Sequence, residues 1–278
     1  MSEKIWLVTG CATGFGRAIA EAALAQGHKV AVTDRNLAAV EDFALRYPET
    51  ALPLGLDVTN SDQIAAAVDA SFRHFERIDV LVNNAGYAVQ QAVEEADMPS
   101  VRGMYEVNLF GMIGVIRAAL PGLRAQGSGH IINFASVAGR VSAPFMALYA
   151  SSKFAVEGLS EGLAGELAAF GIRVTVVEPG AFATRFGAAA MMSSNPHPAY
   201  APLREGMSAH IKNLVMGDPA DLAAAILKLA ESPNPPLRFV GGADAYGMIE
   251  GNLKAQQDEM AQWRALSDEA NKVVLQTG

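Results

Sequence analysis

The stretch TGCATGFG, Thr9 to Gly16, follows a short apolar run and precedes a segment whose apolar residues have helical spacing. Its glycines, Gly10, Gly14 and Gly16, allow backbone N–H groups to approach a pyrophosphate at a helix N-terminus, where the helix dipole favours negative charge. A tight strand–helix turn without a ligand is the alternative for such a loop taken alone. Because this loop opens the first strand–helix–strand unit of the chain, the dinucleotide-binding fingerprint is favoured.

Apolar runs rich in β-branched residues recur along the chain and alternate with helical patterns. The runs are continuously apolar, which is typical of buried parallel strands. The expected strands are residues 5–10, 29–34, 51–58, 78–86, 130–136, 172–180 and 237–242. The expected helices include residues 16–27, 37–47, 61–75, 99–125 and 153–171. The alternation predicts a Rossmann-type α/β fold, a doubly wound parallel sheet with right-handed crossovers and helices on both faces.

The pattern changes after residue 180. No internal repeat or linker precedes that point, so residues 1–278 are expected to form one domain. Residues 181–217 are rich in Ala, Met, Pro and Gly, and a connection of this length is typical of a substrate lid. Asp218 is a good N-cap for a helix that restarts at Pro219. A polar amphipathic helix over 249–269 is expected within a C-terminal helical extension, residues 249–278.

Composition argues against several classes of protein. The chain is 51% hydrophobic and 18% charged, which favours an ordered globule, and its net charge of −8 disfavours binding to nucleic acid or an anionic membrane. No unbroken run of about eighteen apolar residues predicts a membrane span, and no signal peptide is evident, so a cytoplasmic protein is expected. One cysteine and five histidines without ligand spacing predict no metal site. His28, His74 and His130 are expected to be solvated.

LYASSK, Leu148 to Lys153, places Tyr149 and Lys153 four residues apart, on one face of a helix. A surface lysine beside a half-buried tyrosine is one interpretation, and a proton-transfer site is the other. A free tyrosine has a pKa of about 10, and a nearby ammonium favours its phenolate. We therefore expect Lys153 to lower the pKa of Tyr149. Ser136 leaves a predicted strand at the carboxyl edge of the sheet, where parallel α/β folds bind ligands.

Asp34 ends the second expected strand, eighteen residues after Gly16. A carboxylate at that position can accept hydrogen bonds from an adenosine ribose and repels a 2′-phosphate, which favours NAD. Arg35 follows directly, and its guanidinium suits a 2′-phosphate, which keeps NADP as the alternative.

In this order and spacing, the motifs resemble the short-chain dehydrogenase/reductase family in its compact single-domain branch. TGCATGFG is similar to the family's TGxxxGxG, and three further loops match it: LDV at 56–58, NNAG at 83–86 and PGAFAT at 179–184. Asn108, Ser136, Tyr149 and Lys153 are similar to its catalytic set. The match is close over residues 4–185 and looser over 218–242. It implies about seven strands in the order 3-2-1-4-5-6-7.

The resemblance also implies a role for each matching residue. Tyr149 is the implied general acid/base, Ser136 orients the substrate oxygen, Lys153 holds the nicotinamide ribose, and Asn108 anchors a water-mediated proton relay. The implied cofactor-binding residues are Gly10, Thr13, Gly14, Phe15, Gly16, Asp34, Arg35, Asp57, Val58, Asn84, Ala85, Gly86, Tyr149, Lys153, Pro179, Gly180, Phe182 and Thr184. The tail beyond residue 247 is longer than usual for the family.

The implied activity is NAD(P)-dependent interconversion of a secondary alcohol and a ketone or aldehyde. The candidates for contact with an apolar or aromatic substrate are Ser136, Phe145, Met146, Tyr149, Phe186, Met191 and Tyr200. Closure of the lid onto the core is the alternative for its apolar residues. Two other functions stay open: an isomerase or epimerase with tightly held cofactor, and a dinucleotide sensor without turnover. Helices 99–125 and 148–170 are apolar almost all round, so a homodimer or homotetramer is expected.

Overall fold

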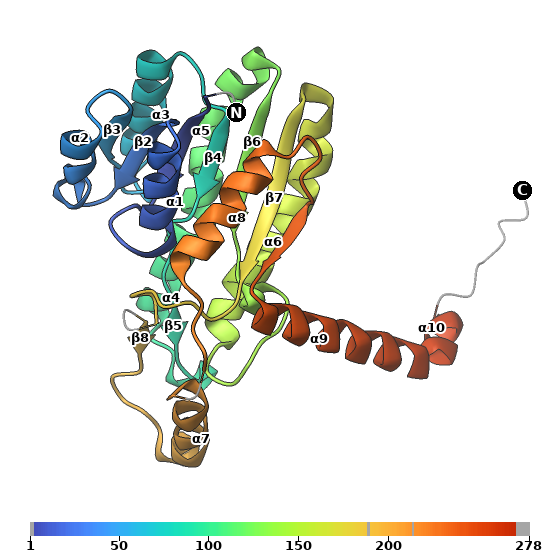
Figure 1. Ribbon diagram of the computed structural model, residues 1–278. Helices are drawn as coiled ribbons and strands as arrows, with labels where there is room; N and C mark the ends of the chain where they lie inside the picture. The colour runs from blue at the N-terminus through green and yellow to red at the C-terminus, as the bar shows by residue number, and fades with distance from the viewer. Residues whose placement is uncertain (1–2, 188–189, 213, 271–278) are drawn as a thin grey trace, which may run out of the picture.

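The chain forms a parallel sheet between two layers of helices (Figure 1). The computed structural model describes residues 3–187, 190–212 and 214–270. Among these residues the main sheet has seven strands in the order β3-β2-β1-β4-β6-β7-β9. Their bounds are β1 Ile5–Thr9, β2 Lys29–Asp34, β3 Ala51–Gly55, β4 Val80–Asn83, β6 Gly129–Phe134, β7 Ile172–Pro179 and β9 Arg238–Gly241. With the main strands counted from one to seven, this is the expected order 3-2-1-4-5-6-7, so the Rossmann-type fold is confirmed.

Alternation along β1 explains how the sheet is covered on both sides. All five of its residues are buried, and its side chains point to opposite faces in turn. Ile5 and Leu7 pack in one core cluster, and Trp6 and Val8 in another. β1 pairs in parallel with both β2 and β4. The strand order therefore reverses beside β1, and a crevice at the carboxyl ends of β1 and β4 is the expected ligand position.

The two helical layers follow the two core clusters. The first layer consists of α1 Gly14–Ala25, α2 Asp42–Arg46 and α8 Pro219–Glu231. The second consists of α3 Ser61–Phe75, α5 Met112–Gln126 and α6 Ala147–Leu167. Short 3-10 turns occur at η1 Leu37–Ala39, η2 Val93–Glu95, η4 Val137–Gly139 and η5 Ala168–Phe170. Asp218 caps α8 as expected, with its carboxylate accepting a 2.8 Å bond from Ala220 N.

The helix expected over residues 99–125 is longer and contains a change of winding. It runs as α4 Met98–Tyr105, a π-helical segment η3 Glu106–Gly111, and α5. By length and composition this helix, Met98–Gln126, resembles a membrane span. One face of α5 is buried in the core cluster beneath the sheet, which accounts for the apolar composition of that part.

The structure contains elements that the sequence pattern did not resolve, most of them in the C-terminal third. β5 Val89–Gln90 pairs in parallel with β8 Met191–Met192, and η6 Pro198–Tyr200 leads into α7 Ala201–Lys212. The terminal helix α9, Ala243–Gln262, begins six residues before the expected residue 249 and is followed by α10 Arg264–Ala270. Both helices project from the body (Figure 1). Residues 271–278 of the expected extension lie outside the described residues.

Two histidines contradict the expectation that they are solvated. His28 and His130 are almost completely buried. His28 Nδ1 accepts a hydrogen bond from Lys4 N, and His130 Nε2 lies 2.9 Å from Thr175 Oγ1. Burial lowers the pKa of His130 to about 3, so this imidazole stays neutral. Position at the end of a strand was a poor guide, because neighbouring strands and helices cover those ends.

Candidate active site

Four loops meet at the carboxyl edge of the sheet. They follow β1, β4, β6 and β7, which are adjacent strands in the order β1-β4-β6-β7. These loops carry the Thr9–Gly16 stretch, Asn84–Gly86, Ser136 and Gly180–Thr184. Residues that are far apart in sequence are therefore brought together by parallel pairing alone.

The glycine loop has a shape that only glycine allows at several positions. Gly10 and Gly14 have φ of +74° and +62°, which side chains rarely adopt. A Cβ on Gly16 would lie 2.3 Å from Gly10 O. Asn84 Nδ2 donates to Thr9 O at 2.9 Å and to Gly10 O at 3.1 Å, which fixes the loop against the β4 loop.

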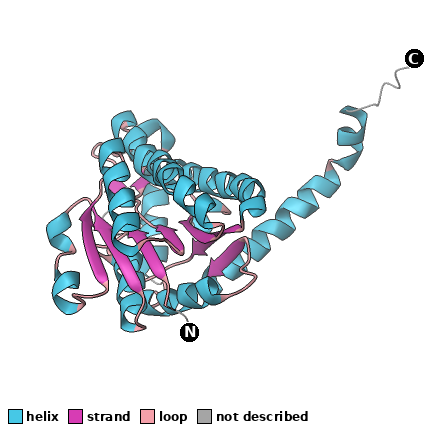
Figure 2. Cartoon of the chain, turned by 90° about the horizontal axis from the view of Figure 1, so that it is seen from above, coloured by secondary structure: helices cyan, strands magenta, loops and turns pink. Residues whose placement is uncertain are grey.

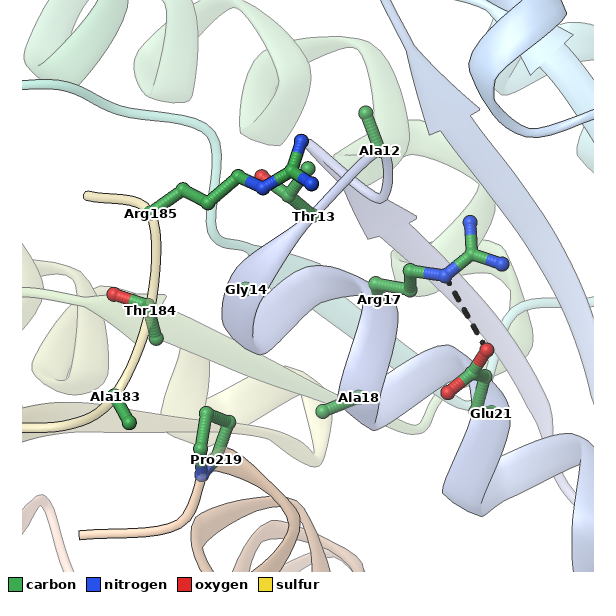
Figure 3. A pocket seen from close by; sticks show the side chains of 10 residues that line it. All are labelled: Ala12, Thr13, Gly14, Arg17, Ala18, Glu21, Ala183, Thr184, Arg185 and Pro219. Carbon is green, nitrogen blue, oxygen red and sulfur yellow. Dashed lines mark ion pairs between the residues drawn. The ribbon is translucent and has the colours of Figure 1, made fainter. Parts of the chain in front are cut away.

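The N-terminus of α1 fits a phosphate group. Thr13, its N-cap residue, makes no capping bond with its side chain, so the first N–H groups are available to an anion. The adjacent cavity has a volume of about 480 Å³ (Figure 3). Its lining residues are Ala12, Thr13, Gly14, Arg17, Ala18, Glu21, Ala183, Thr184, Arg185 and Pro219. The residues present therefore suit the phosphate portion of a dinucleotide.

Two cations line this cavity, Arg17 and Arg185. The resemblance to the family did not include either among the cofactor-binding residues. Arg185 is exposed, whereas Arg17 is held by ion pairs to Asp42 at 2.5 Å and to Glu21 at 3.3 Å. The 25-residue separation of Arg17 and Asp42 explains why no local motif revealed the pair. An exposed guanidinium at the rim can contact phosphate, which makes Arg185 the stronger addition to the site.

Asp34 lies at the end of β2 beside the glycine loop. Its carboxylate accepts hydrogen bonds from Ala12 N at 3.1 Å and from Asn36 N at 3.0 Å. Arg35 is exposed next to it. The carboxylate therefore both positions the loop and presents negative charge where an adenosine ribose is expected.

The loop after β3 contains a hydrogen-bonded turn. Asp57 Oδ1 accepts bonds from Thr59 N and Oγ1, so this carboxylate organises the turn. Val58 is buried against Gly111, at the end of η3. The position of both residues beside the β2 end is compatible with the expected adenine contact.

Tyr149 and Lys153 are both buried, and both are only 4% exposed. Burial raises the pKa of Tyr149, and a hydrogen bond with the Ser136 hydroxyl opposes that rise. Lys153 Nζ lies 5.8 Å from the Tyr149 ring centre and donates a 2.8 Å hydrogen bond to Phe134 O. The net pKa of Tyr149 is therefore raised in the protein alone, because the loss of hydration outweighs the Ser136 hydrogen bond, and the expected lowering by Lys153 is not among its causes.

Burial also changes the lysine. It lowers the pKa of Lys153 to about 8, so the ammonium still predominates at neutral pH. A phenol, a hydroxyl and an ammonium therefore share a site from which most water is excluded.

Asn108 lies within the π-helical segment and is fully buried. Its Oδ1 accepts from Tyr87 N at 3.0 Å, and its Nδ2 donates to Tyr87 O and to Ser152 Oγ. A Cβ on Gly86 would lie 3.0 Å from Asn108 Oδ1 and 3.6 Å from Lys153 Nζ. Gly86 therefore leaves the space beside Asn108 and Lys153 open, and π-helical turns often occur at such functional positions.

The loop after β7 is held by aromatic and carboxylate contacts. Phe182 packs edge-on against Phe15, with ring centres 5.1 Å apart. Asp244 accepts from Ala181 N at 2.8 Å, and it would be only 2.2 Å from a Cβ on Gly180. Phe15 and Phe182 thus position two loops against each other, whereas Thr184 faces the cavity lined by Gly14.

The lid places only some of the expected residues at the site. Phe186 lies beside Tyr149, with ring centres 5.6 Å apart, and Phe145 lies 6.1 Å from Tyr200. Met146 packs in the same apolar cluster as Tyr149. Met191 differs from these, because it is 41% exposed and its backbone pairs with β5.

A charged pair fixes the lid at a point that the sequence did not reveal. Arg204 of α7 forms an ion pair with the buried carboxylate of Glu95. Its guanidinium also lies 4.7 Å from the Phe145 ring centre. Glu95 further accepts from His197 N at 2.7 Å, so one carboxylate joins two parts of the lid to η2.

Comparison with known proteins finds relatives over nearly the whole chain. A family model described as short chain dehydrogenase matches residues 4–193. Oxidoreductase BOA17 of Botryotinia fuckeliana is 38% identical over 270 residues, which cover 95% of this chain and 98% of that protein. A 3-ketodihydrosphingosine reductase of Bacteroides thetaiotaomicron is 35% identical and covers 95% of this chain and 97% of its own length.

Solved structures agree over nearly the whole chain. A short-chain dehydrogenase from Streptomyces avermitilis has a TM-score of 0.90 at 41% identity, covering 98% of this chain and all of that one. One from Burkholderia cenocepacia, in complex with NADP, has a TM-score of 0.74 at 28% identity and covers 94% of this chain and 97% of that one. The fold, the strand-end loops and these likenesses lead to one conclusion: the chain belongs to the short-chain dehydrogenase/reductase family of oxidoreductases.

Proposed function

We propose that this protein is an NAD(P)-dependent oxidoreductase that interconverts a secondary alcohol and a ketone or aldehyde. The observation that carries the proposal is the meeting of Ser136, Tyr149 and Lys153 in a buried site beside Asn108. The glycine loop and the N-terminus of α1 lie at the same edge of the sheet and suit a dinucleotide phosphate.

In the reductive direction, the Tyr149 hydroxyl gives its proton to the carbonyl oxygen as negative charge develops there. The Ser136 hydroxyl is a second donor to that oxygen, and such donors stabilise the developing charge. The bound nicotinamide supplies the hydride chemistry. Because burial raises the pKa of Tyr149, the residue is protonated and ready to act as an acid before a ligand adds positive charge.

Lys153 is proposed to hold the nicotinamide ribose. Its ammonium is also proposed to supply a positive charge near Tyr149. Its Nζ donates to Phe134 O, which fixes the ammonium at the edge of β6. Asn108 fixes the neighbouring backbone of Tyr87 through two hydrogen bonds. We propose that Asn108 anchors a proton relay that resupplies Tyr149 by way of Lys153.

The substrate is proposed to be apolar or aromatic near its reactive carbon. Phe186 next to Tyr149, and Met146 in the Tyr149 cluster, give the site an apolar wall. The similar reductase of Bacteroides thetaiotaomicron is named for a 3-ketodihydrosphingosine, which supports a carbonyl compound as the class. Phe145 and Tyr200 are proposed to extend this wall under the lid.

NAD is the proposed cofactor, with NADP as the alternative. Asp34 presents a carboxylate where it can bind a ribose and repel a 2′-phosphate. Structural neighbours support both choices, since one from Burkholderia cenocepacia holds NADP and another from Burkholderia phymatum, 25% identical, holds NAD. Asp34→Ala should raise the rate with NADPH relative to NADH by about tenfold, which corresponds to a free-energy difference of roughly 1.4 kcal/mol. An unchanged ratio would show that Asp34 does not select the cofactor.

The protein is proposed to be a cytoplasmic homodimer or homotetramer. Phe110 on η3 is 53% exposed and Phe154 on α6 is 46% exposed, which suits burial by another subunit. Sedimentation velocity measures the assembly directly, and a monomer at micromolar concentration would contradict this part of the proposal.

A panel of ketones and aldehydes, assayed with NADH and with NADPH, tests the proposed reaction. Turnover of added cofactor in proportion to product is the expected result, and Tyr149→Phe should abolish most of it. An isomerase or epimerase would convert substrate without net cofactor use, and a sensor would bind NADH without reducing any panel member. Full activity in Tyr149→Phe would disprove the assigned mechanism.

A further inference from the structure

The helix α9 leaves the body after its first two turns (Figures 1 and 2). Ala245 and Ile249 are buried against the body, and Asn252 Nδ2 donates to Arg140 O at 2.9 Å. Beyond that contact every described residue, 253–270, is exposed. We call residues 253–270 the arm.

Helix α9 carries an apolar stripe with a seven-residue period that runs from its packed root into the arm. Tyr246, Ile249, Leu253, Met260 and Trp263 follow one another with Gln256 at spacings of three and four residues. This is the a/d pattern of a coiled-coil seam. Trp263 N donates to Glu259 O, so helical geometry continues to the end of the stripe.

Only Ile249 of the stripe is buried against the body, and Tyr246 on its other side is 61% exposed. Ile249 is 5% exposed, whereas Leu253, Met260 and Trp263 are 43%, 73% and 59% exposed. Intrahelical ion pairs, Lys254 with Asp258 and Arg264 with Asp268, support this exposed helix. An apolar seam of this kind on a projecting helix is suited to a second helix.

A groove at the root of the arm combines apolar residues with the charged residues Arg140, Glu157, Glu161 and Arg238. It lies between α6 and α9, has a volume of about 440 Å³, and is open to solvent. Phe154 and Gly158 line it from α6, and Leu253 and Gln256 line it from α9. A Cβ on Gly158 would meet no atom within 4 Å, so a helix can approach closely at this point.

We infer that the arm pairs in an antiparallel manner with the arm of a second copy of this chain, and that each arm covers the groove of the other copy. A parallel pair would bring both roots together, where the face at Ile249 is already occupied by the body. An antiparallel pair instead sets the free ends, Met260 and Trp263, over the partner's groove residues, Gln256 and Leu253. The contact is isologous and closes as a two-fold dimer.

Of the charged residues beside the stripe, one pair favours this antiparallel register and one residue opposes it. Glu250 and Arg264 occupy equivalent flanking positions two heptads apart, so each faces the other across the antiparallel pair. The two copies of Glu259 meet near the two-fold axis, and like charges oppose association there. This residue therefore limits the affinity of the pair. The inference goes beyond the proposed reaction and depends on no catalytic step.

Cross-linking of co-expressed chains tests the register. One chain carries Gln256→Cys and the other, with a different tag, carries Met260→Cys; Cys11 is fully buried and does not interfere. Mild oxidation should join the two tagged chains by a disulfide. Asp258→Cys with Gln262→Cys is the matched control, with the same spacing on the opposite face of α9. Equal cross-linking in both pairs, or none at Gln256 and Met260, would overturn the inference.

Association energies give an independent test. Met260→Glu combined with Trp263→Glu should weaken the arm-dependent association by about tenfold or more, as expected for a central aromatic contact. Glu259→Gln should instead strengthen the arm-dependent association by a few-fold, which is about the effect of a single surface charge pair. Sedimentation equilibrium measures both changes. Weaker or unchanged association in Glu259→Gln would contradict the antiparallel register, and an unchanged double variant would contradict arm pairing itself.

Discussion

The strand-end loops and the lid that covers them hold their side chains in different ways. At the strand-end edge, Asn84 of the β4 loop, Asn108 of η3 and Lys153 of α6 each donate to a backbone carbonyl. In the lid, Phe186 and Tyr200 are positioned by ring contacts, and one ion pair ties α7 to the body.

This difference indicates that the strand-end site carries out the proposed chemistry and that the lid selects the substrate. Backbone hydrogen bonds in a close-packed interior permit little displacement, so the loops can fix reacting groups. Ring contacts on a surface segment can rearrange around ligands of different shape. Changes in the loops should therefore impair turnover, and changes in the lid should alter substrate affinity.

The largest effect is expected from Lys153→Met, which shortens the side chain by one atom and removes its charge. Loss of the proposed ribose anchor should lower kcat/KM by about 100-fold or more, since small misplacements of reactants are that costly. Phe134 O also loses its donor, so the free energy of unfolding should fall by about 1–3 kcal/mol. Steady-state kinetics and thermal unfolding measure the two effects. A variant with near-normal kcat/KM would remove Lys153 from the site.

Gly16→Ala should have the next largest effect. Its Cβ would lie 2.3 Å from Gly10 O, so the cofactor loop must shift. Overpacking of this kind costs about 1–3 kcal/mol, which corresponds to a loss of about 10- to 100-fold in cofactor affinity. Fluorescence titration with NADH measures it. Gly206→Ala on α7, where a Cβ meets no atom within 4 Å, is the matched control in the lid and should leave the affinity unchanged.

Arg204→Met tests the lid side of the comparison. Loss of the pair with Glu95 should loosen the lid and raise KM by about tenfold, close to the cost of breaking a partly buried charge contact, with kcat nearly unchanged. Initial rates over a range of substrate concentrations separate the two constants. Arg73→Met, which breaks only an exposed pair with Asp69, should change neither. A loss confined to kcat would contradict the proposed division of roles.

The smallest effect concerns stability against pH. Burial and the neighbouring Glu178 raise the pKa of Glu157 to about 7, from 4.5 in an unfolded chain. The folded protein therefore holds a proton that the unfolded chain releases, so stability should fall as pH rises from about 4.5 to about 7. Urea unfolding across this window should show a decline of about 1–3 kcal/mol that Glu157→Gln removes.

Glu161→Gln is the control for that measurement. Glu161 pairs with the same Arg238, but its hydrogen bond with that guanidinium lowers its pKa. The decline with pH should persist in this variant. If Glu157→Gln kept the full decline, another group would have to be responsible.

The positions of the main strands followed from sequence patterns, whereas their order and the candidate catalytic residues followed from the resemblance to the family. Continuous apolar runs such as β6 have few alternatives to a buried parallel strand, and Gly10, Gly14 and Gly16 mark a turn by their own conformational needs. Both signals are local, so they can be read from neighbouring residues. The candidate residues Ser136, Tyr149 and Lys153 then come together because parallel strands end at one edge.

Contacts between distant segments decided the rest. The chain brings Arg204 to Glu95 across 109 residues, buries His28 and His130, and introduces the π-helical turn at Asn108. It also leaves residues 253–270 of the arm exposed, so the part of the stripe that lies there is a surface of the molecule. The sequence by itself determined which residues carry charge, hydroxyl groups and conformational freedom. Only the tertiary structure decided which of them lose water, because burial depends on segments far away along the chain.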